Sequence, residues 1–386
     1  MRFLKSLLVA NTALANSIIL KPPGPEVELG TSTAELIDYS RTNTWGNDTS
    51  PRSIIISVFY PLGSKPCHGS YQTPYVPSVV SDFERSYFKP YGALANISYS
   101  SFKSQFHKKC SKGGADYPVL IFSPGYYRTR LLYSILAQSV AKSGYIVLTI
   151  DHPYDADVVV LPSGKVIYGV NDANFTSIEQ YQPAIDVRVA DFAFLLSTLS
   201  RPRSVKRLFP SLPYHLDMEK VGMFGHSAGG ASLANFMVSE PRIVGGLNMD
   251  GSHFPPVTEV GLDQPFLFFG QKSHNHFTDS SWNATWAKLR GWHAELSLGS
   301  ATHSTFGDLA LLAKVLGLRH EAGEQISRVI GTIDGGTAMV DERTVVVDFF
   351  DFVMKGKKSK LLRGDNEGFP DISYVTDICQ PEDGCT

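Results

Sequence analysis

The sequence predicts an α/β fold with a mostly parallel central sheet and helices on both faces. Short apolar runs recur along the 386-residue chain without the polar–apolar alternation of half-exposed strands, which is typical of strands buried on both faces. Helical patterns separate these runs, and alternating strands and helices favour a parallel sheet. The length could hold two domains, but we expect a single domain over residues 16–386.

The individual elements follow from local patterns. We expect strands at residues 54–60, 119–123, 145–150, 221–224, 243–249, 266–269 and 294–298. The clearest helix presents one apolar face, formed at helical spacing by Ile185, Val189, Phe192, Leu196 and Leu199. Further helical patterns occur at residues 131–140, 309–316 and 345–354.

Three segments fit this alternation poorly. Residues 21–51 are rich in Pro, Gly, Thr and Asn, which predicts an irregular or edge segment. Residues 64–117 are long, aromatic and polar, and we expect an insertion there rather than a second domain. A C-terminal tail begins near residue 357, where a run of lysines is typical of a solvated helix end.

Composition excludes several classes of protein. Lys plus Arg is 35 and Asp plus Glu is 37, so the net charge of −2 gives no global electrostatic case for nucleic acid. The 43% apolar content argues against a disordered chain. After the N-terminus, no run reaches the roughly 18 uninterrupted apolar residues of a membrane-spanning helix.

The first residues predict a secretory signal over residues 1–15. Arg2 and Lys5 precede a mostly apolar stretch, and Ala13-Leu14-Ala15 forms a small-x-small cleavage site that would be cut after Ala15. Because the apolar stretch is short, an ordinary N-terminal helix is the alternative.

Cysteines and glycosylation sequons agree with a secreted protein. Asn-x-Ser/Thr triplets begin at Asn47, Asn96, Asn174 and Asn283. The cysteines are even in number, at Cys67, Cys110, Cys379 and Cys385, and allow three pairings. Their placement favours Cys67 with Cys110 and Cys379 with Cys385. We therefore expect an oxidised, extracellular glycoprotein with disulfide bonds.

The central motif for chemistry is Gly225–Gly229, which reads Gly-His-Ser-Ala-Gly. The motif alone is a weak signal, but a strand pattern runs into it and a helical pattern at 230–238 follows. Strand–turn–helix is the context in which this turn places the hydroxyl of Ser227 above the sheet edge as a nucleophile. Glycines at both ends remove side chains where strand and helix nearly touch. A Gly-rich turn without chemistry is the alternative.

Two backbone N–H groups are expected to form an oxyanion hole beside Ser227. The N–H of Ala228 directly follows the nucleophile. The second donor should come from the loop after an earlier strand, where Tyr126 is the natural candidate and Gly125 lets the backbone approach the substrate. An ordinary Pro-Gly turn is the alternative at this loop.

A base is expected on a loop after the last clear strand. Of the 11 histidines, His303 fits this place best. The competitors are His253, His274, His276, His293 and His320. The cluster of His274, His276 and Asp279 lacks a fixed ligand framework, so we expect no metal site.

The orienting acid is less clear from topology. Asp250 directly follows the strand at 243–249, and Asp279 lies in the loop after the next strand. Topology divides these two nearly evenly, although Asp250 has the better local context. The acid would fix the tautomer of His303 and stabilise its charged form.

Several stretches resemble the platelet-activating factor acetylhydrolase family of the plasma and intracellular single-chain type. The stretches are 122–130 (FSPGYYRTR), 143–147 with Asp151-His152, 225–230 (GHSAGG), 248–251 (NMDG), 303–308 (HSTFGD) and 331–334 (GTID). The similarity spans much of residues 54–356, and the segment at His303 is more specific than the serine motif. Pro124 and Ala228 depart from the His and Phe that the family often has.

The resemblance implies an α/β-hydrolase fold and a carboxylic ester hydrolase with no cofactor. It implies Ser227 as nucleophile, Asp250 rather than Asp279 as acid, His303 as base, and backbone donors at Tyr126 and Ala228. It also implies calcium-independent removal of short or oxidised acyl chains from the middle, sn-2, position of phospholipids.

The substrate is expected to be a phospholipid or small ester, cleaved through an acyl-enzyme. We expect a substrate pocket that includes Gly125, Tyr127, His226 and Phe254, with an apolar lip that could touch a lipid surface. The alternative is a secreted carboxylesterase, lipase or cutinase-like polyesterase with the same residues. A non-catalytic relative and an amidase or peptidase are weaker alternatives.

Overall fold

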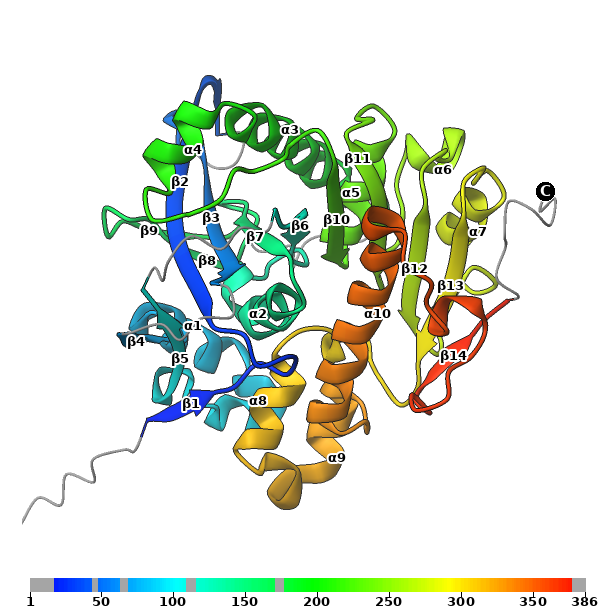
Figure 1. Cartoon of the computed structure of the whole chain (residues 1–386). Coiled ribbons are helices and arrows are strands. Elements are labelled where there is room, and N and C mark those ends of the chain that lie inside the picture. The colour runs from blue at the N-terminus through cyan, green and yellow to red at the C-terminus, as the bar shows by residue number, and fades with distance from the viewer. Residues whose placement is uncertain (1–16, 44–47, 63–68, 109–115, 171–176, 377–386) are drawn as a thin grey trace, which may run out of the picture.

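The computed structural model describes residues 17–43, 48–62, 69–108, 116–170 and 177–376 (Figure 1). The expected signal peptide, all four cysteines, and the sequons at Asn47 and Asn174 lie outside these residues. In the part of the chain that is described, no helix is long and apolar enough to cross a membrane.

A nine-stranded mixed sheet forms the centre of the molecule, which confirms the predicted fold class. Its strand order is β14-β13-β12-β11-β10-β6-β7-β3-β2. The strands are β2 (Leu29–Thr42), β3 (Pro51–Pro61), β6 (Val119–Ser123), β7 (Ile146–Asp151), β10 (Val221–His226), β11 (Ile243–Met249), β12 (Phe266–Gln271), β13 (His293–Leu298) and β14 (Ile372–Tyr374). In this order, every pair of adjacent strands between β13 and β7 is parallel. At the edges, β14 pairs antiparallel with β13, β3 with β7, and β2 with β3.

Both faces of the sheet are buried, which explains why its strands read as continuous apolar runs. In β6, Leu120 and Phe122 belong to one hydrophobic cluster, and Val119 and Ile121 belong to another on the opposite face. Every residue of β6, β7 and β10 is buried.

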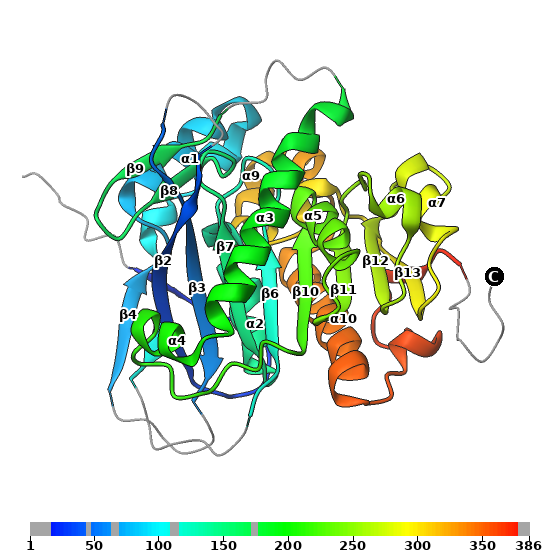
Figure 2. The same cartoon turned by 90° about the horizontal axis from the view of Figure 1, so that it is seen from above.

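Helices cover the two faces as expected. One cluster includes side chains of α2 (Ser134–Lys142), α8 (Leu309–Val315) and α10 (Gly335–Lys355). The other includes side chains of α3 (Gln182–Leu199) and α5 (Ala228–Met237). Figure 2 shows α3 and α5 in front of the sheet, with α2 and α10 behind it.

The remaining elements are short or peripheral. They are β1 (Ile18–Leu20), β4 (Ser70–Pro74), α1 (Ser78–Tyr87), η1 (Lys89–Asn96), η2 (Tyr99–Ser101), β5 (Phe102–His107), η3 (Arg130–Tyr133), β8 (Val158–Val160), β9 (Val166–Tyr168), η4 (Ile178–Tyr181), α4 (Pro202–Leu208), α6 (Val257–Val260), α7 (Ser280–Trp286), η5 (His303–Thr305), α9 (Leu318–Ile330) and η6 (Leu361–Arg363).

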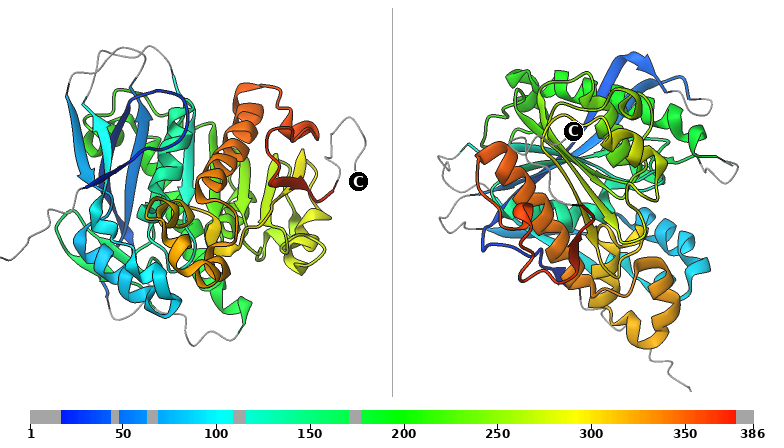
Figure 3. Two further views of the ribbon diagram at one scale, coloured as in Figure 1. Left: turned by 90° about the horizontal axis from the view of Figure 1, so that it is seen from below. Right: turned by 90° about the vertical axis from the view of Figure 1, so that its right-hand side faces the viewer.

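The three segments that fitted poorly have more structure than their composition indicated. For residues 21–51, where an irregular or edge segment was expected, the edge alternative is confirmed by β2, a long strand at one edge of the sheet. Within 64–117, β4 and β5 join β1 in a second, three-stranded sheet. Residues 372–374 of the tail form β14, at the opposite edge of the main sheet from β2 (Figure 3).

Candidate active site

Ser227 occupies a sharp turn at the carboxyl end of the central strand β10. The strand ends at His226 and α5 begins at Ala228, so one residue joins them. Its backbone angles, φ 53° and ψ −124°, are strained for a non-glycine residue. A Cβ at Gly225 would lie 2.5 Å from the carbonyl carbon of Gly229, so this crossing requires glycine. The turn is the strand–turn–helix that the motif predicted.

His303 and Asp250 come from the loops that follow the carboxyl ends of two different parallel strands, β13 and β11. Asp250 directly follows β11 and is almost fully buried, whereas His303 opens η5 after β13 and its side chain is 48% exposed. His303 Nδ1 donates to Asp250 Oδ2 over 2.6 Å. Because a carboxylate only accepts, this bond leaves Nε2 as the nitrogen that can take a proton.

The electrostatics keep Asp250 ionised. Burial alone would raise the pKa of its carboxyl group, but hydrogen bonds from His274 and His303 hold that pKa well below its ordinary value. An ionised Asp250 stabilises the charge that a proton brings to His303.

Ser227 and His303 lie together where two cavities meet. A cavity of about 110 Å³ extends to one side and includes the apolar side chains Phe88, Leu132, Phe306 and Leu309. A larger cavity of about 390 Å³ extends to the other side and includes Ile178, Tyr181, Ala228, Ser252 and Phe254. Tyr126, Ser227 and His303 line both cavities. The nucleophile, the base and one expected oxyanion residue therefore share one junction.

The two residues expected to supply oxyanion donors lie on either side of Ser227. Ala228 is the first residue of α5, where backbone N–H groups have no acceptor within the helix. Tyr126 follows β6 in the loop that begins with Pro124 and Gly125. A Cβ at Gly125 would lie 3.4 Å from the Cβ of Ser227, so this loop passes close to the nucleophile.

Arg188 fixes the backbone of this loop through hydrogen bonds, a role that the sequence did not predict. The guanidinium lies fully buried on α3 and pairs with buried Asp155 at 2.5 Å and 2.7 Å. It also donates to the carbonyl oxygens of Pro124 and Gly125 at 2.5 Å and 3.0 Å. The one signal for this role in the sequence is that Arg188 follows Ile185 by a helical step, on a face that otherwise carries apolar residues.

The residues expected to form a substrate pocket divide between the cavities. Gly125 and His226 line the smaller cavity, and Phe254 lines the larger one. Tyr127 lines neither: it has φ 53°, and its ring packs 6.3 Å from that of Phe83 and 6.0 Å from that of Tyr87. The ring of Tyr127 therefore lies toward α1, and its place in a substrate pocket stays a prediction.

His226 is placed to support the ring of His303. Its Nδ1 is 2.8 Å from the hydroxyl of Tyr133, and its ring centroid is 4.5 Å from that of His303. Burial, together with the nearby charge of His303, holds the pKa of His226 well below its ordinary value. A neutral His226 can pack against His303 without repelling its proton.

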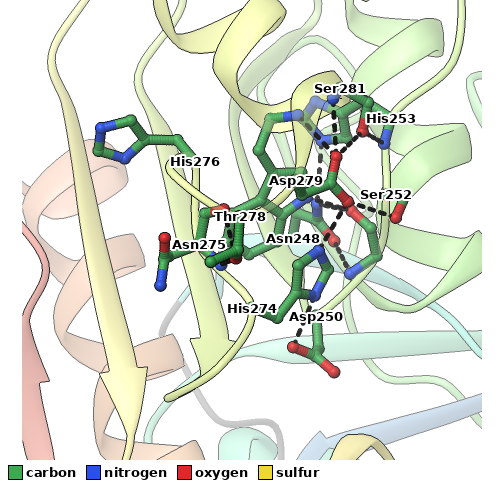
Figure 4. A network of polar contacts seen from close by, with 12 residues as sticks. Asn248, Asp250, Ser252, His253, His274, Asn275, His276, Thr278, Asp279 and Ser281 are labelled. Carbon is green, nitrogen blue, oxygen red and sulfur yellow. Dashed lines mark hydrogen bonds and ion pairs between the residues drawn. The ribbon is translucent and has the colours of Figure 1, made fainter.

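Asp279, the rival acid, does not bond to His303. It caps the N-terminus of α7 and bonds instead to His274, which in turn bonds to Asp250 (Figure 4). The competitor His253 is buried and bonds to Asn248 and Thr285. Within the described residues, no group of three His, Cys, Asp or Glu side chains has an arrangement that could hold a metal ion.

Comparison with known proteins supports an esterase of the expected kind. The sequence model of the family "Platelet-activating factor acetylhydrolase, isoform II" matches residues 42–161. A probable 1-alkyl-2-acetylglycerophosphocholine esterase from Arthroderma benhamiae is 29% identical over 392 residues, which cover 95% of this chain and 97% of that protein. A platelet-activating factor acetylhydrolase from Cavia porcellus is 23% identical over 64% of this chain and 60% of its own length.

A solved structure extends the similarity to the whole fold. The ferulic acid esterase from Streptomyces cinnamoneus aligns with a TM-score of 0.78 and 25% identity, over 94% of this chain and 100% of that structure. The expected resemblance and the expected class of enzyme, a carboxylic ester hydrolase, are confirmed by these similarities.

Proposed function

We propose that this chain, a relative of the platelet-activating factor acetylhydrolases, is a serine esterase that hydrolyses short or oxidised acyl chains at the sn-2 position of phospholipids. The observation that carries the chemistry is the 2.6 Å bond between His303 and Asp250 beside Ser227. The similarity to a 1-alkyl-2-acetylglycerophosphocholine esterase over nearly the full length supports the substrate class.

The proposed reaction follows from this arrangement. His303 Nε2 takes the proton of Ser227 as the hydroxyl attacks the ester carbonyl. The N–H groups of Ala228 and Tyr126 stabilise the oxyanion, and His303 then gives its proton to the leaving alcohol. Water repeats the sequence on the acyl-enzyme and releases the acid.

The unequal cavities support a short acyl chain. We assign the acyl group to the smaller cavity of about 110 Å³, whose lining includes Phe88, Leu132 and Phe306, and the leaving glycerophospholipid to the larger one of about 390 Å³. Ile178 at the larger cavity is 51% exposed, which supports the proposed contact with a lipid surface.

A simple-ester hydrolase is the second candidate function. The similarity to a ferulic acid esterase over 94% of this chain favours it, because such a fold serves esters that are not lipids. The active-site residues would be the same, so acyl-chain and head-group preference separate the two functions.

Hydrolysis of paired phospholipids tests the proposal. Wild type and Ser227→Ala are compared on an sn-2 acetyl and an sn-2 long-chain phospholipid, with a chelator present and a soluble aryl ester as a third substrate. We expect acetyl preference in the wild type and loss of all cleavage in the variant. Cleavage of the aryl ester alone would support the second function, and cleavage by Ser227→Ala would contradict the mechanism.

We also propose that the protein is secreted, glycosylated and disulfide-bonded. Asn96 and Asn283 are exposed, as glycan acceptors must be. Gly69 and Lys108, which are the nearest described residues to Cys67 and Cys110, are joined by a backbone hydrogen bond of 3.3 Å. Peptide mapping of secreted protein without reduction tests the Cys67–Cys110 and Cys379–Cys385 pairs.

A further inference from the structure

His274 lies between two carboxylates on the side of Asp250 that faces away from His303. Its Nδ1 is 2.9 Å from Asp250 Oδ1, and its Nε2 is 2.8 Å from Asp279 Oδ2 (Figure 4). Carboxylates accept hydrogen bonds and do not donate them when ionised. Both nitrogens of His274 therefore carry protons, and the ring is a cation.

We propose that His274, anchored by Asp279, is a positioning residue that fixes Asp250 for His303. This inference rests on the proposed esterase function. In this arrangement the two acids that chain order could not separate act together. Asp250 contacts the base, and Asp279 holds the imidazole of His274.

The contacts divide the two oxygens of Asp250 between the two rings. Oδ2 accepts from His303, whereas Oδ1 accepts from His274 and from the backbone N–H of Gln271 at 2.9 Å. With three donors on two oxygens, the carboxylate cannot rotate about its Cβ–Cγ bond without breaking a hydrogen bond. His274 supplies the side-chain donor that opposes His303.

Asp279, the other carboxylate bonded to His274, is equally constrained. Asp279 Oδ2 also accepts from the hydroxyl of Ser252 at 2.5 Å, and Oδ1 accepts from the hydroxyl and the N–H of Ser281. The ring of His274 packs against buried Trp282, with centroids 4.3 Å apart. His274 is therefore held on its face and at both nitrogens, as a fixed support for Asp250 requires.

The surrounding charges favour the cation. Burial would lower the pKa of His274, but its bonds to Asp250 and Asp279 raise that pKa to about 9. The other titratable groups around it come from separate elements: His303 on η5, His253 after β11, and Glu295 on β13. Glu295 is itself bonded to His276, so Asp250 and Asp279 provide the bonded negative charge at His274.

The charge of His274 decides how firmly Asp250 is held. Once His274 loses a proton, the neutral ring can donate to only one carboxylate, and the support for Asp250 weakens.

The pH profile of hydrolysis tests the inference through His274→Gln, with the soluble aryl ester as substrate. Gln has an amide donor but no charge. We expect about a tenfold loss of kcat at neutral pH with little change in KM, because Asp250 loses its charged support. The decline of kcat near pH 9 in the wild type should disappear. In Asp279→Asn, where the cation loses one partner, that decline should move to lower pH.

His276→Gln is the matched control. His276 belongs to the same loop and bonds to a buried carboxylate, Glu295, but it points away from Asp250 (Figure 4). The control should keep the wild-type profile. A loss of activity in His274→Gln that leaves the decline near pH 9 in place would show a purely structural role and overturn the inference.

Two further outcomes separate this inference from the proposed function. If Ser227→Ala retains hydrolysis, the esterase mechanism itself fails. If Ser227→Ala is inactive but His274→Gln has a wild-type profile, only the inference fails. NMR of the ring nitrogens in the Ser227→Ala protein gives an answer that needs no activity and no folded His274 variant: two protonated nitrogens on His274 up to about pH 9 are expected, and titration below pH 7 would overturn the inference.

Discussion

The two sides of Ser227 are stabilised by different kinds of charge. On the oxyanion side, the buried guanidinium of Arg188 pairs with Asp155 and holds the loop carbonyls. On the base side, imidazoles pair with Asp250 and Asp279. A guanidinium keeps its proton at any pH at which a protein folds, whereas an imidazole titrates near neutrality. Solvent pH therefore acts on the base side and leaves the oxyanion side unchanged.

The largest expected effect is on the base side, in Asp250→Asn. The amide keeps the shape but removes the charge that fixes the tautomer of His303, so we expect kcat to fall on the order of 10³- to 10⁴-fold. Steady-state kinetics measures this loss. Asp279→Asn, which does not contact His303, should cost much less at neutral pH. Equal losses in the two variants would remove the distinction between the acids.

Arg188→Ala should produce the next largest effect, as a loss of stability on the oxyanion side. It leaves Asp155 buried without its partner, and we expect the free energy of unfolding to fall by about 3–5 kcal/mol, with a lower kcat as the loop loosens. Urea unfolding measures the change. The control is Arg242→Ala, which breaks the partly exposed pair with Glu240 and should cost about 1 kcal/mol or less.

A smaller effect should appear when pH alone is changed. The pKa of His274 is raised from its ordinary 6.5 to about 9, so its contribution is complete below pH 6.5 and is lost as pH rises through 9. The difference corresponds to on the order of 3 kcal/mol of unfolding free energy. Unfolding of wild type and His274→Gln at pH 6.5 and 9.5 measures it. If the unfolding free energy of wild type and His274→Gln changed equally between the two pH values, His274 would not be the group that makes the base side sensitive to pH.

Much of the fold was predictable because burial leaves a direct pattern in the sequence. The strands around Ser227 are buried on both faces, so their apolar runs located β6, β10, β11 and β13 to within two residues at each end. The edge strand β2 was harder to predict. Only one face of it packs, its inward residues include Asp38 beside Ala34 and Leu36, and its composition resembles that of a loop.

The site was predictable where chemistry and chain order agree. Ser227, Asp250 and His303 follow strands whose carboxyl ends share one edge of the sheet, and the structure brings His303 to Asp250. The roles of Arg188 and His274 were not predicted, because their partners Asp155 and Asp250 are distant from them in sequence. Spacing along the chain carries no signal for such contacts. The positive φ of Tyr127 is likewise a local backbone feature that the sequence did not indicate.

The short strand β14 has a consequence for how the enzyme is made. It pairs with β13, the strand that leads to the loop of His303, and Asp371 accepts from the N–H of Gly299 at 2.6 Å. Residues 371–374 are synthesised long after β13, so one edge of β13 has no partner until they have been made. Until then, the loop that carries His303 follows a strand that is paired on one side only, by β12.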